Sequence, residues 1–445
     1  MNKIILTIVG LLISGFCLGQ DPLTLEDALR IGLEKNFSIQ IEKQRVEIAK
    51  NSNTLGQAGM WPSVTVGATQ SFSRTELDNP ASFLVAGNIQ GQTFNPTVGV
   101  AWTLFNGFNV RISKSRLDYL EQQSLGNAQV VVENSIQAII LAYYTALLEK
   151  ERLDVFERTL KLSGDRYAYG KLKGQLGTAV TFDILQDKNA YLTDSSNYIT
   201  QIQNYRNSVR NVNLLMGIDV ESEFELVDSL VAQPQNYVRD DLYNLMVSNN
   251  NNLKNQYLNQ EIFKRDVLLA RSSMYPSINL NLNGSSNRQI QDLSSAEFAN
   301  GNTGQSGIKS STLNYTAGLT LSYTLFNGGR IRTQLENAKI NERIAAVQTS
   351  ELKASLKNNL ISTFDQYNLN VNLLSIAREN VQTAELNLQL ATDRYRNGTI
   401  SSFNFRDIQI TYLGSSLSYV QAIYNVIEAE TELMRLVGGL SSTYE

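Results

Sequence analysis

Asp183 and Asp187 are the two residues whose type and spacing come nearest to supporting chemistry in this chain. Their positions, i and i+4, place both carboxylates on one face of a helix, where they could share general acid and base work. No other chemically suited residue converges on them in the sequence. Such pairs are usually solvated helix surface, and we therefore predict no catalytic residue and no enzyme.

Composition restricts the possible chemistry further. The chain of 445 residues contains no histidine, and its one cysteine is Cys17. Without histidine, and with a single cysteine, the chain cannot build a usual zinc site or a Ser-His-Asp triad, so we predict no metal and no cofactor. The net charge of −4 and the pI near 5.3 offer no basic field to a nucleic acid. Hydrophobic residues make up 42% of the chain, which is ample for a folded core.

Residues 1–19 have the pattern of a secretory signal peptide. A short positive region precedes an apolar run at 4–13, and Cys17 and Gly19 place small residues before a cut at Gln20. A membrane anchor is a second interpretation, but about 13 apolar residues fall short of the ~20 that span a bilayer. Lipidation of Cys17 instead of its removal is a third. In the mature chain, the most apolar run, at 136–148, is too short to span a membrane, and we expect no transmembrane helix.

Internal repeats show that the chain is a duplication. The phrase WTLFNGFNVR at Trp102 returns as YTLFNGGRIR at Tyr323, and LMG at Leu215 returns as LVG at Leu436, both 221 residues later. MWPSV also recurs as MYPSI, and DRY occurs twice, with the order preserved. Repeats of this kind mark copies of one structural unit. We expect a first repeat at 20–216, a polar connector at 217–239, a second repeat at 240–438 and a tail at 439–445.

Each repeat contains one predicted β-hairpin, at 62–105 and at 276–326. Aliphatic and aromatic residues such as Val66 alternate there with uncharged Ser, Thr, Asn and Gly. This pattern is typical of a transmembrane β-barrel strand, which is apolar toward lipid and polar toward a wet lumen. Polar hairpin ends are expected near 75–92 and 287–311. A small antiparallel sheet in a soluble domain is the alternative.

Aromatic residues gather at one end of the hairpins, where a belt at the membrane interface would lie. They are Trp61, Trp102, Phe105, Tyr275, Tyr323 and Phe326. Four strands are too few to close a barrel, and open sheet edges do not occur in lipid. If the strands face lipid, several copies of the chain must therefore combine their strands.

A long helical pattern follows each hairpin, with apolar residues at coiled-coil spacing. Each long helix would extend over roughly 95–105 Å, and two shorter helices end to end would match it. Glycine-containing tips connect each long helix to a return helix. We expect long helices at 107–170 and 328–396, tips at 169–178 and 396–401, return helices at 178–216 and 402–437, and leading helices at 24–59 and 240–273.

The signal peptide, duplicated unit, M-[WY]-P-S hairpins, L-F-N-G junctions, glycine tips and L-[MV]-G ends together resemble the TolC-type outer-membrane efflux proteins. The resemblance covers essentially the whole mature chain. It implies a mixed α and transmembrane β fold, in which a homotrimer closes a 12-stranded β-barrel from four strands per chain. A long coiled-coil α-helical barrel would continue from it. The β-barrel would lie in the outer-membrane lipid, and the helical tunnel would extend into the periplasm.

The implied function is the passive exit duct of a tripartite efflux or type I secretion system, which exports small molecules or proteins. An inner-membrane pump and a periplasmic adaptor (membrane fusion) protein would feed the tunnel at its tips. A structural coiled-coil envelope protein without transport activity is the alternative. The implied adaptor-docking residues are Gly170, Lys171, Gly174, Gly177, Thr178, Asn397, Gly398 and Thr399.

The resemblance also implies a gate, or aperture, just beyond the tips. Its expected residues are Asp183, Asp187, Tyr395, Asn404 and Asp407. Asn404 occupies a position where the family often has aspartate, and Ile400 stands where an arginine is usual, with Arg396 or Arg406 as substitutes. A ring of carboxylates at a narrow pore favours cations. Stabilisation of a helix N-terminus by Asp183 and a solvated face for Asp407 remain open alternatives.

Overall fold

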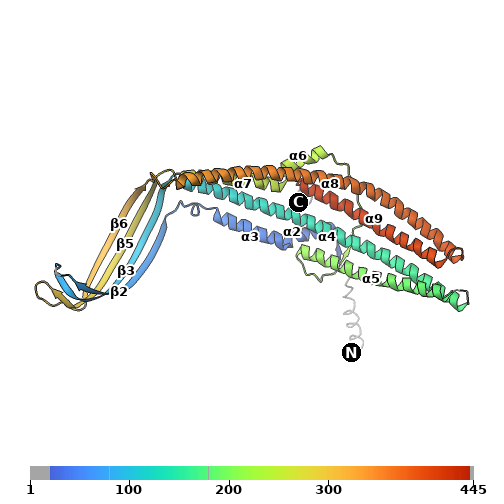
Figure 1. The fold of residues 1–445 in the computed structure, drawn as a ribbon, viewed down its shortest axis with the longest axis horizontal. Coiled ribbons are helices and arrows are strands. Elements are labelled where there is room, and N and C mark those ends of the chain that lie inside the picture. The colour runs from blue at the N-terminus through green and yellow to red at the C-terminus, as the bar shows by residue number, and fades with distance from the viewer. Residues whose placement is uncertain (1–20, 80, 179, 441–445) are drawn as a thin grey trace, which may run out of the picture. The chain divides into compact units, whose positions relative to one another are not determined.

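The computed structural model describes residues 21–79, 81–178 and 180–440. The expected signal peptide, with Cys17, and most of the expected tail lie outside these residues. The chain forms two compact units: Met1–Val46, Leu125–Asn255 and Thr349–Glu445 make up the helical unit, and Glu47–Ser124 and Gln256–Gln348 make up the strand-bearing unit. The expected combination of long helices and a four-stranded sheet is confirmed (Figure 1).

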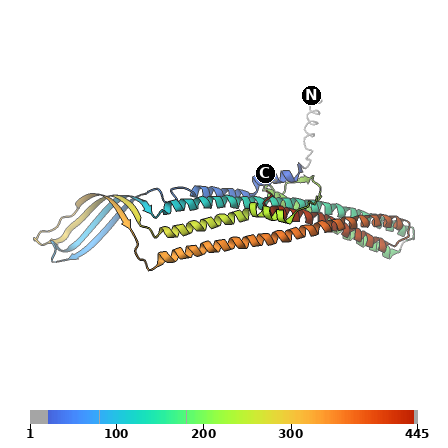
Figure 2. The same cartoon turned by 90° about the horizontal axis from the view of Figure 1, so that it is seen from above.

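The strand-bearing unit contains one antiparallel sheet with the strand order β2-β3-β5-β6 (Figures 1 and 2). Its strands are β2 (Ser63–Asp78), β3 (Leu84–Asn106), β5 (Ser277–Phe298) and β6 (Ile308–Ser322). One hairpin from each repeat therefore lies beside the other, through the pairing of β3 with β5. The edge strands β2 and β6 are exposed along nearly their whole length.

The strands extend further than the apolar alternation predicts. Polar ends were expected at 75–92 and 287–311, yet the strands enclose only 79–83 and 299–307. Backbone groups form the ladder whatever the side chain, so pairing continues after the apolar alternation stops. Register shifts in the β3–β5 pair, between Leu84 and Ala86 and between Asn88 and Gln90, lie in this polar part of the strands.

The long helices α4 (Asn109–Gln175) and α8 (Arg330–Arg396) have 67 residues each. At 1.5 Å per residue each extends for about 100 Å, as expected. The return helices are α5 (Thr181–Met216) and α9 (Ser402–Leu436). By length and composition α4 could cross a membrane, contrary to the sequence-based expectation. Half of its most apolar window is buried inside the structure, however, as in the core helix of a soluble protein.

Each expected leading helix is in fact two helices with a break at an asparagine. The pairs are α2 (Leu25–Lys35) with α3 (Phe37–Ser52), and α6 (Arg239–Asn249) with α7 (Asn251–Ser272). The breaks are equivalent: the side-chain amide of Asn36 donates to the Leu215 carbonyl at 2.7 Å, and that of Asn250 donates to the Leu436 carbonyl at 3.0 Å. Their side-chain oxygens accept from backbone N–H groups of the following helix, as N-caps do.

The glycine of each L-[MV]-G motif makes these joints possible. Gly217 and Gly438 have φ values of 73° and 70°, which other residues rarely adopt. A Cβ atom would lie 2.2 Å from the Lys35 carbonyl oxygen at Gly217, and 2.7 Å from that of Asn249 at Gly438. The two motifs therefore end α5 and α9 against equivalent helix breaks.

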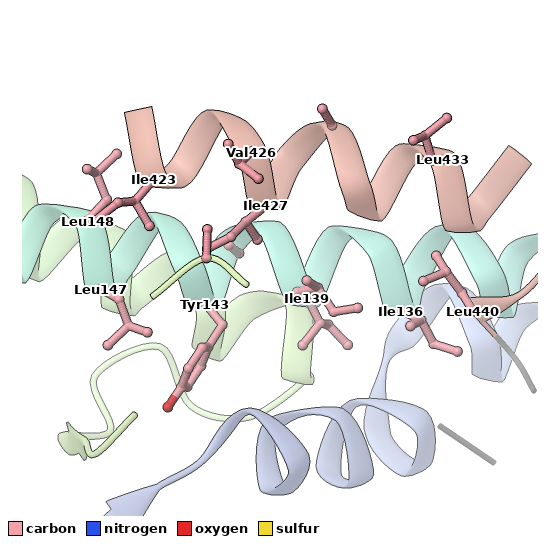
Figure 3. Close-up of a cluster of buried hydrophobic side chains, with 14 of the residues drawn as sticks. Ile136, Ile139, Tyr143, Leu147, Leu148, Ile423, Val426, Ile427, Leu433 and Leu440 are labelled. Carbon is pink, nitrogen blue, oxygen red and sulfur yellow. The ribbon is translucent and has the colours of Figure 1, made fainter. Parts of the chain in front are cut away.

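The core of the helical unit lies where α4 packs against α9 and the short segments near the connector. Ile136, Ile139 and Leu147 of α4 are buried together with Val426 of α9 (Figure 3). The connector is structured here, because β4 (Phe224–Leu226) pairs in parallel with β1 (Asp21–Leu23). The Tyr143 hydroxyl donates to the Leu23 carbonyl at 2.8 Å and lies 2.8 Å from an Asp228 carboxylate oxygen, which fixes this small sheet to α4.

Candidate functional site

The tips of the two helical hairpins share one turn structure. In the first, the backbone N–H and the hydroxyl of Thr178 donate to the Lys173 carbonyl, at 2.9 and 3.1 Å. In the second, the same two groups of Thr399 donate to the Arg394 carbonyl, at 2.8 and 2.9 Å. These bonds satisfy carbonyl groups that a helix end leaves unpaired. The matching threonines are therefore structural parts of both tips.

A buried charged cluster lies just behind the tips. The carboxylate of Asp187 on α5 pairs with the guanidinium of Arg166 on α4, with 3.0 Å between Oδ1 and Nε. Both side chains are at most 2% exposed. The hydroxyl of Ser402, at the start of α9, donates to the same carboxylate oxygen. Asp187 therefore connects three helices that come from both repeats.

Gly170 makes room for this carboxylate. A Cβ atom at Gly170 would lie 2.9 Å from Oδ2 of Asp187, closer than real Cβ contacts allow. Gly170 lies in α4, one turn beyond Arg166. The same helix therefore supplies both the guanidinium that pairs with Asp187 and the space that its carboxylate occupies. Gly170, which we predicted for adaptor docking, is buried here against Asp187.

Arg166 extends the cluster to α9 by donating from Nη1 to Oε1 of Gln409 at 3.0 Å. Gln409 and Arg166 are 1% and 3% exposed. Nη2 of Arg166 and Nε2 of Gln409 are buried and have no hydrogen-bond partner among the described residues. Removing one partner of a buried ion pair typically costs about 3–5 kcal/mol, because the other charge stays buried and uncompensated.

A second connection between α5 and α9 lies further from the tips. Arg406 donates through Nη1 and Nη2 to the two carboxylate oxygens of Asp194, at 2.7 and 2.8 Å. The Asp194 side chain is 2% exposed and that of Arg406 is 16% exposed. Bidentate pairs of this kind are among the stronger and more directional polar contacts in proteins.

Burial controls the protonation of the cluster. It raises the pKa of Asp187 above its ordinary value, although the hydrogen bond from Ser402 and the charge of Arg166 oppose this rise. The negative charge of Asp183 raises the pKa of Asp187 further. Burial also raises the pKa of Tyr395, and the charge of Asp187 adds to that effect.

An aromatic stack joins α8 to α9 and α4. The Tyr395 ring lies parallel to that of Phe405, with 4.8 Å between centroids, and edge-on to Tyr169 at 5.9 Å. The Tyr169 hydroxyl donates to the Arg396 carbonyl at 3.2 Å. Nζ of Lys173 lies 4.6 Å from the Tyr169 ring centroid, a cation–π distance. Tyr395 is therefore held between helices of both repeats.

The predicted gate residues fall into two groups. Asp187 and Tyr395 lie in or beside the buried cluster, whereas Asp183, Asn404 and Asp407 are exposed. Asp183 is in the first turn of α5, where a carboxylate favours the helix dipole. The backbone N–H of Asn404 donates to Ser401, which caps α9.

Sequence reasoning missed Arg166, Asp194, Ser402 and Gln409. Arg166 belongs to the first DRY motif, and the arginine of the second DRY motif, Arg394, is exposed. The available signal for these residues was a polar side chain on an otherwise apolar helix face. That signal does not identify the partners, because the residues that pair with α9 are more than 200 positions away from it in the sequence.

The tips expose apolar side chains. Around the first turn, Leu176 is 70% exposed, Phe182 is 71% exposed and Val180 is 67% exposed. Phe403, just after the second turn, is 66% exposed. Of the predicted docking residues, Lys171, Gly177, Thr178, Asn397, Gly398 and Thr399 are also exposed. Clustered exposed apolar groups mark surfaces that other molecules cover.

The sheet exposes its apolar residues as well. Val66 is 80% exposed and Leu321 is 68% exposed, so neither faces a core within this chain. Among the predicted interface aromatics, Trp61, Trp102, Tyr275, Tyr323 and Phe326 are exposed, and Phe105 packs edge-on against Phe108 at 5.3 Å. The indole of Trp102 donates to the Met60 carbonyl at 2.9 Å.

Comparison with known proteins agrees with this architecture. The profile of the family described as "Outer membrane efflux protein" matches residues 242–439, which is most of the second repeat. The chain is 21% identical over 430 residues to the toluene efflux pump outer membrane protein TtgC of Pseudomonas putida, covering 94% of this chain and 83% of that protein. It is 20% identical over 424 residues to nodulation protein T of Rhizobium leguminosarum, covering 94% and 82%.

Solved channels share the fold. The Campylobacter jejuni CmeC outer membrane channel superimposes with a TM-score of 0.73 at 14% identity, covering 93% of this chain and 85% of that one. VceC from Vibrio cholerae superimposes with a TM-score of 0.69 at 15% identity, covering 93% and 96%.

The fold is therefore that of the TolC-like outer-membrane channels, whose long helical barrel joins a β domain. The second repeat of this chain matches the outer membrane efflux protein family, the chain resembles the TolC-type efflux proteins over nearly its whole length, and it is a protein of the outer membrane. Its relatives are channel proteins rather than enzymes, which supports an efflux channel role.

Proposed function

We propose that this chain forms the passive exit duct of a tripartite efflux or type I secretion system. An inner-membrane pump would drive small molecules or proteins through a periplasmic adaptor into the duct. The relatives named as efflux pump outer membrane proteins support this assignment. The two repeats, 20–216 and 240–438, would each supply one hairpin and one set of helices to the duct wall.

The apolar face of the sheet is the observation that carries the proposal. Val64 and Val100 pair across β2 and β3, and Leu280 and Leu319 pair across β5 and β6. Their neighbours on the opposite face are small uncharged polar residues, such as Thr65. One face thus suits acyl chains and the other suits water, as barrel strands in membranes require. A structural coiled-coil protein without transport activity has no use for such a sheet.

The open edges of the sheet favour a homotrimer. β2 and β6 each have one neighbour in the chain, so each leaves a row of backbone groups unpaired on its outer side. Such groups are not tolerated in a bilayer, and pairing β2 of one copy with β6 of the next removes both edges. Three copies close 12 strands, which lies within the range of transmembrane barrels.

The buried cluster would act as a latch for the gate. Asp187, Arg166 and Ser402 hold the hairpin α4–α5 against α9, and Asp194 with Arg406 holds the same helices further along. Breaking these contacts would let the tips separate. The exposed Asp183 and Asp407 would then line the aperture and favour cations.

The tips would dock the adaptor. Leu176, Val180 and Phe182 offer an exposed apolar surface around the first turn. Apolar groups of this kind become buried when a partner helix packs against them. Lys171, which is exposed near the end of α4, adds a positive charge.

Planar bilayer recordings test the duct. The purified full chain in detergent should insert and give stepwise conductance, and Arg166→Gln should raise the conductance or the open fraction by loosening the latch. Arg158→Gln, which replaces an exposed arginine on the same helix, is the matched control. A protein that inserts into bilayers and gives no conductance, with or without the latch variant, would contradict the proposal.

A further inference from the structure

The charges of the sheet follow a pattern along the strands. From the helix-proximal end, neither face carries a charge over 63–73 in β2, 277–287 in β5 and 310–322 in β6, and β3 has none at all. The first charge on each remaining strand is basic: Arg74, Arg288 and Lys309. We call these three residues the basic rim.

All three residues of the basic rim lie on the apolar face of the sheet. Arg74 shares its side of β2 with Val64 and Val66, because side chains alternate between faces and the β2–β3 register is uninterrupted. Lys309 and Arg288 are on the same side as Leu319 and Leu280 by the same argument, through the uninterrupted β5–β6 register. The opposite face has no basic residue over the whole length of the described strands.

The basic rim begins at the level along the strands where the apolar face of the sheet ends. The apolar face begins at Leu104 and ends at Phe94 on β3, which pairs with Arg288 on β5. Ten residues at about 3.3 Å each, tilted by about 40°, span about 25 Å, which is the height of the apolar band of outer-membrane barrels. Phe72 and Phe94 are exposed at this upper end, opposite Trp102 at the lower end. The basic residues therefore begin where the acyl chains would stop.

The three cations are free to bind an outside group. All are exposed, and Arg288 and Lys309 form no ion pair with any residue that the structure describes. Arg288 pairs with Ser311, so Lys309 is its diagonal neighbour, about 7–8 Å away at the Cα atoms. Arg74 donates from Nε to Asn88, a neutral partner, at 2.9 Å.

A hollow lies between the strands at this level. Its volume is about 430 Å³, and Phe72, Ile290, Arg74 and Gln92 are among its lining residues. Asp292 also lines it, but this carboxylate accepts the backbone N–H of Ser294 at 2.9 Å. The apolar side chains suit the upper part of an acyl chain, and Arg74 suits an anionic group above it.

We propose that the basic rim binds the phosphate-bearing headgroups of lipids in the outer leaflet of the outer membrane. Arginine and lysine pair with phosphate oxygens, and the adjacent apolar band and hollow receive the acyl chains of the same lipid. The lipid class is therefore one with an uncompensated anionic phosphate. The leaflet assignment rests on the proposed duct, since the strand tips face the cell surface only if the helices lie in the periplasm.

Lipid binding to the full chain in dodecyl maltoside micelles tests this inference. Dioleoyl phosphatidate is the probe, dioleoyl phosphatidylcholine the comparison, and native mass spectrometry counts the bound lipids. The triple variant Arg74→Gln, Arg288→Gln, Lys309→Gln should lose phosphatidate affinity on the order of 100-fold, because each basic group near an anionic lipid contributes about fivefold. Its binding of phosphatidylcholine should not change.

A matched triple variant on α8, Arg332→Gln, Lys339→Gln, Arg343→Gln, removes the same charge from the same unit outside the sheet and should keep wild-type affinity. Asp292→Asn should strengthen binding, and inorganic phosphate at equal concentration should not displace phosphatidate. Equal losses in both triple variants, or no loss in the rim variant, would overturn the inference. If the triple rim variant does not fold, Lys309→Gln alone should show the fivefold loss, and its absence would count against the rim.

Micelle binding does not depend on conductance, so the two proposals fail separately. If the protein binds phosphatidate through the basic rim but gives no conductance, the duct and the leaflet assignment are wrong and the lipid site stands. A conducting protein whose phosphatidate binding ignores the rim would remove only the lipid site.

Discussion

The guanidinium of Arg406 donates two hydrogen bonds, of 2.7 and 2.8 Å, to the carboxylate of Asp194, although the two residues are 212 positions apart in the sequence. One residue belongs to the return helix of the first repeat and the other to that of the second. Together with the Arg166–Asp187 pair, this contact ties the two helical hairpins at two levels behind their tips. The side chains of Arg166, Asp187 and Asp194 are at most 2% exposed, so removing the partner of any of them leaves a buried charge uncompensated.

Loss of the Asp187 carboxylate should destabilise the helical unit. We expect Asp187→Ala to lower the free energy of unfolding by about 3–5 kcal/mol, because the guanidinium of Arg166 stays buried without its anion. Asp183→Ala, an exposed change on the same helix, should alter it by less than about 0.5 kcal/mol. Chemical unfolding of the detergent-solubilised protein, followed by circular dichroism, measures both. Equal effects of the two variants would show that the buried pair does not hold the hairpins.

The raised pKa of Asp187 predicts a pH dependence with a definite sign. In the window between the ordinary pKa of 3.8 and the raised folded value, the folded state binds more protons than the unfolded state. The contribution of this carboxyl to stability is therefore largest below 3.8 and declines as pH rises through the folded pKa. Asp187→Asn should remove that decline. Melting temperatures of both proteins measured across this window test it, and parallel curves would contradict the shift.

Gly170 and Gly414 should respond oppositely to alanine. Gly170→Ala places a methyl group 2.9 Å from Oδ2 of Asp187 and should lower the melting temperature. Gly414 lies within α9 with nothing within 4 Å of its ideal Cβ position, so Gly414→Ala should stabilise that helix by about 0.5–1 kcal/mol. Differential scanning calorimetry compares the two variants. A neutral or stabilising Gly170→Ala would mean that Asp187 does not need this space.

The apolar tip should be required for adaptor association. Leu176→Ser with Phe182→Ser removes two side chains that are 70% and 71% exposed, and we expect co-purification of the periplasmic adaptor from intact envelopes to fall at least tenfold. Leu192→Ser, which changes an exposed leucine further along α5, is the control and should leave it unchanged. Deletion of 171–176 should act like the double variant. Normal co-purification of both would exclude this tip as the docking surface.

The repetitive parts of the fold were predictable from the sequence because periodicity reports which faces are buried. The long helices, the hairpins and the duplication follow from spacing alone. The breaks at Asn36 and Asn250 were missed, since an asparagine inside a helical pattern gives little warning that its amide will cap a new helix. The polar upper parts of the strands were missed because backbone pairing there continues without apolar alternation.

Prediction of the site was less complete for a physical reason. Asp187 and Tyr395 were identified by the resemblance, but no spacing rule reveals that α4, α5, α8 and α9 meet behind the tips. Arg166, Gln409 and Asp194 become recognisable only when that packing buries them. The predicted aperture residues Asp183, Asn404 and Asp407 are exposed in the single chain, as the proposed aperture requires.

The mass of the protein in detergent tests the central claim most directly. Size-exclusion chromatography with multi-angle light scattering, corrected for bound detergent, should give a protein mass of three copies of the mature chain. The edges β2 and β6 would then be paired between copies. A monodisperse monomer that stays folded after the detergent is removed would contradict the account, because its sheet would then have to tolerate two open edges and an exposed apolar face in water.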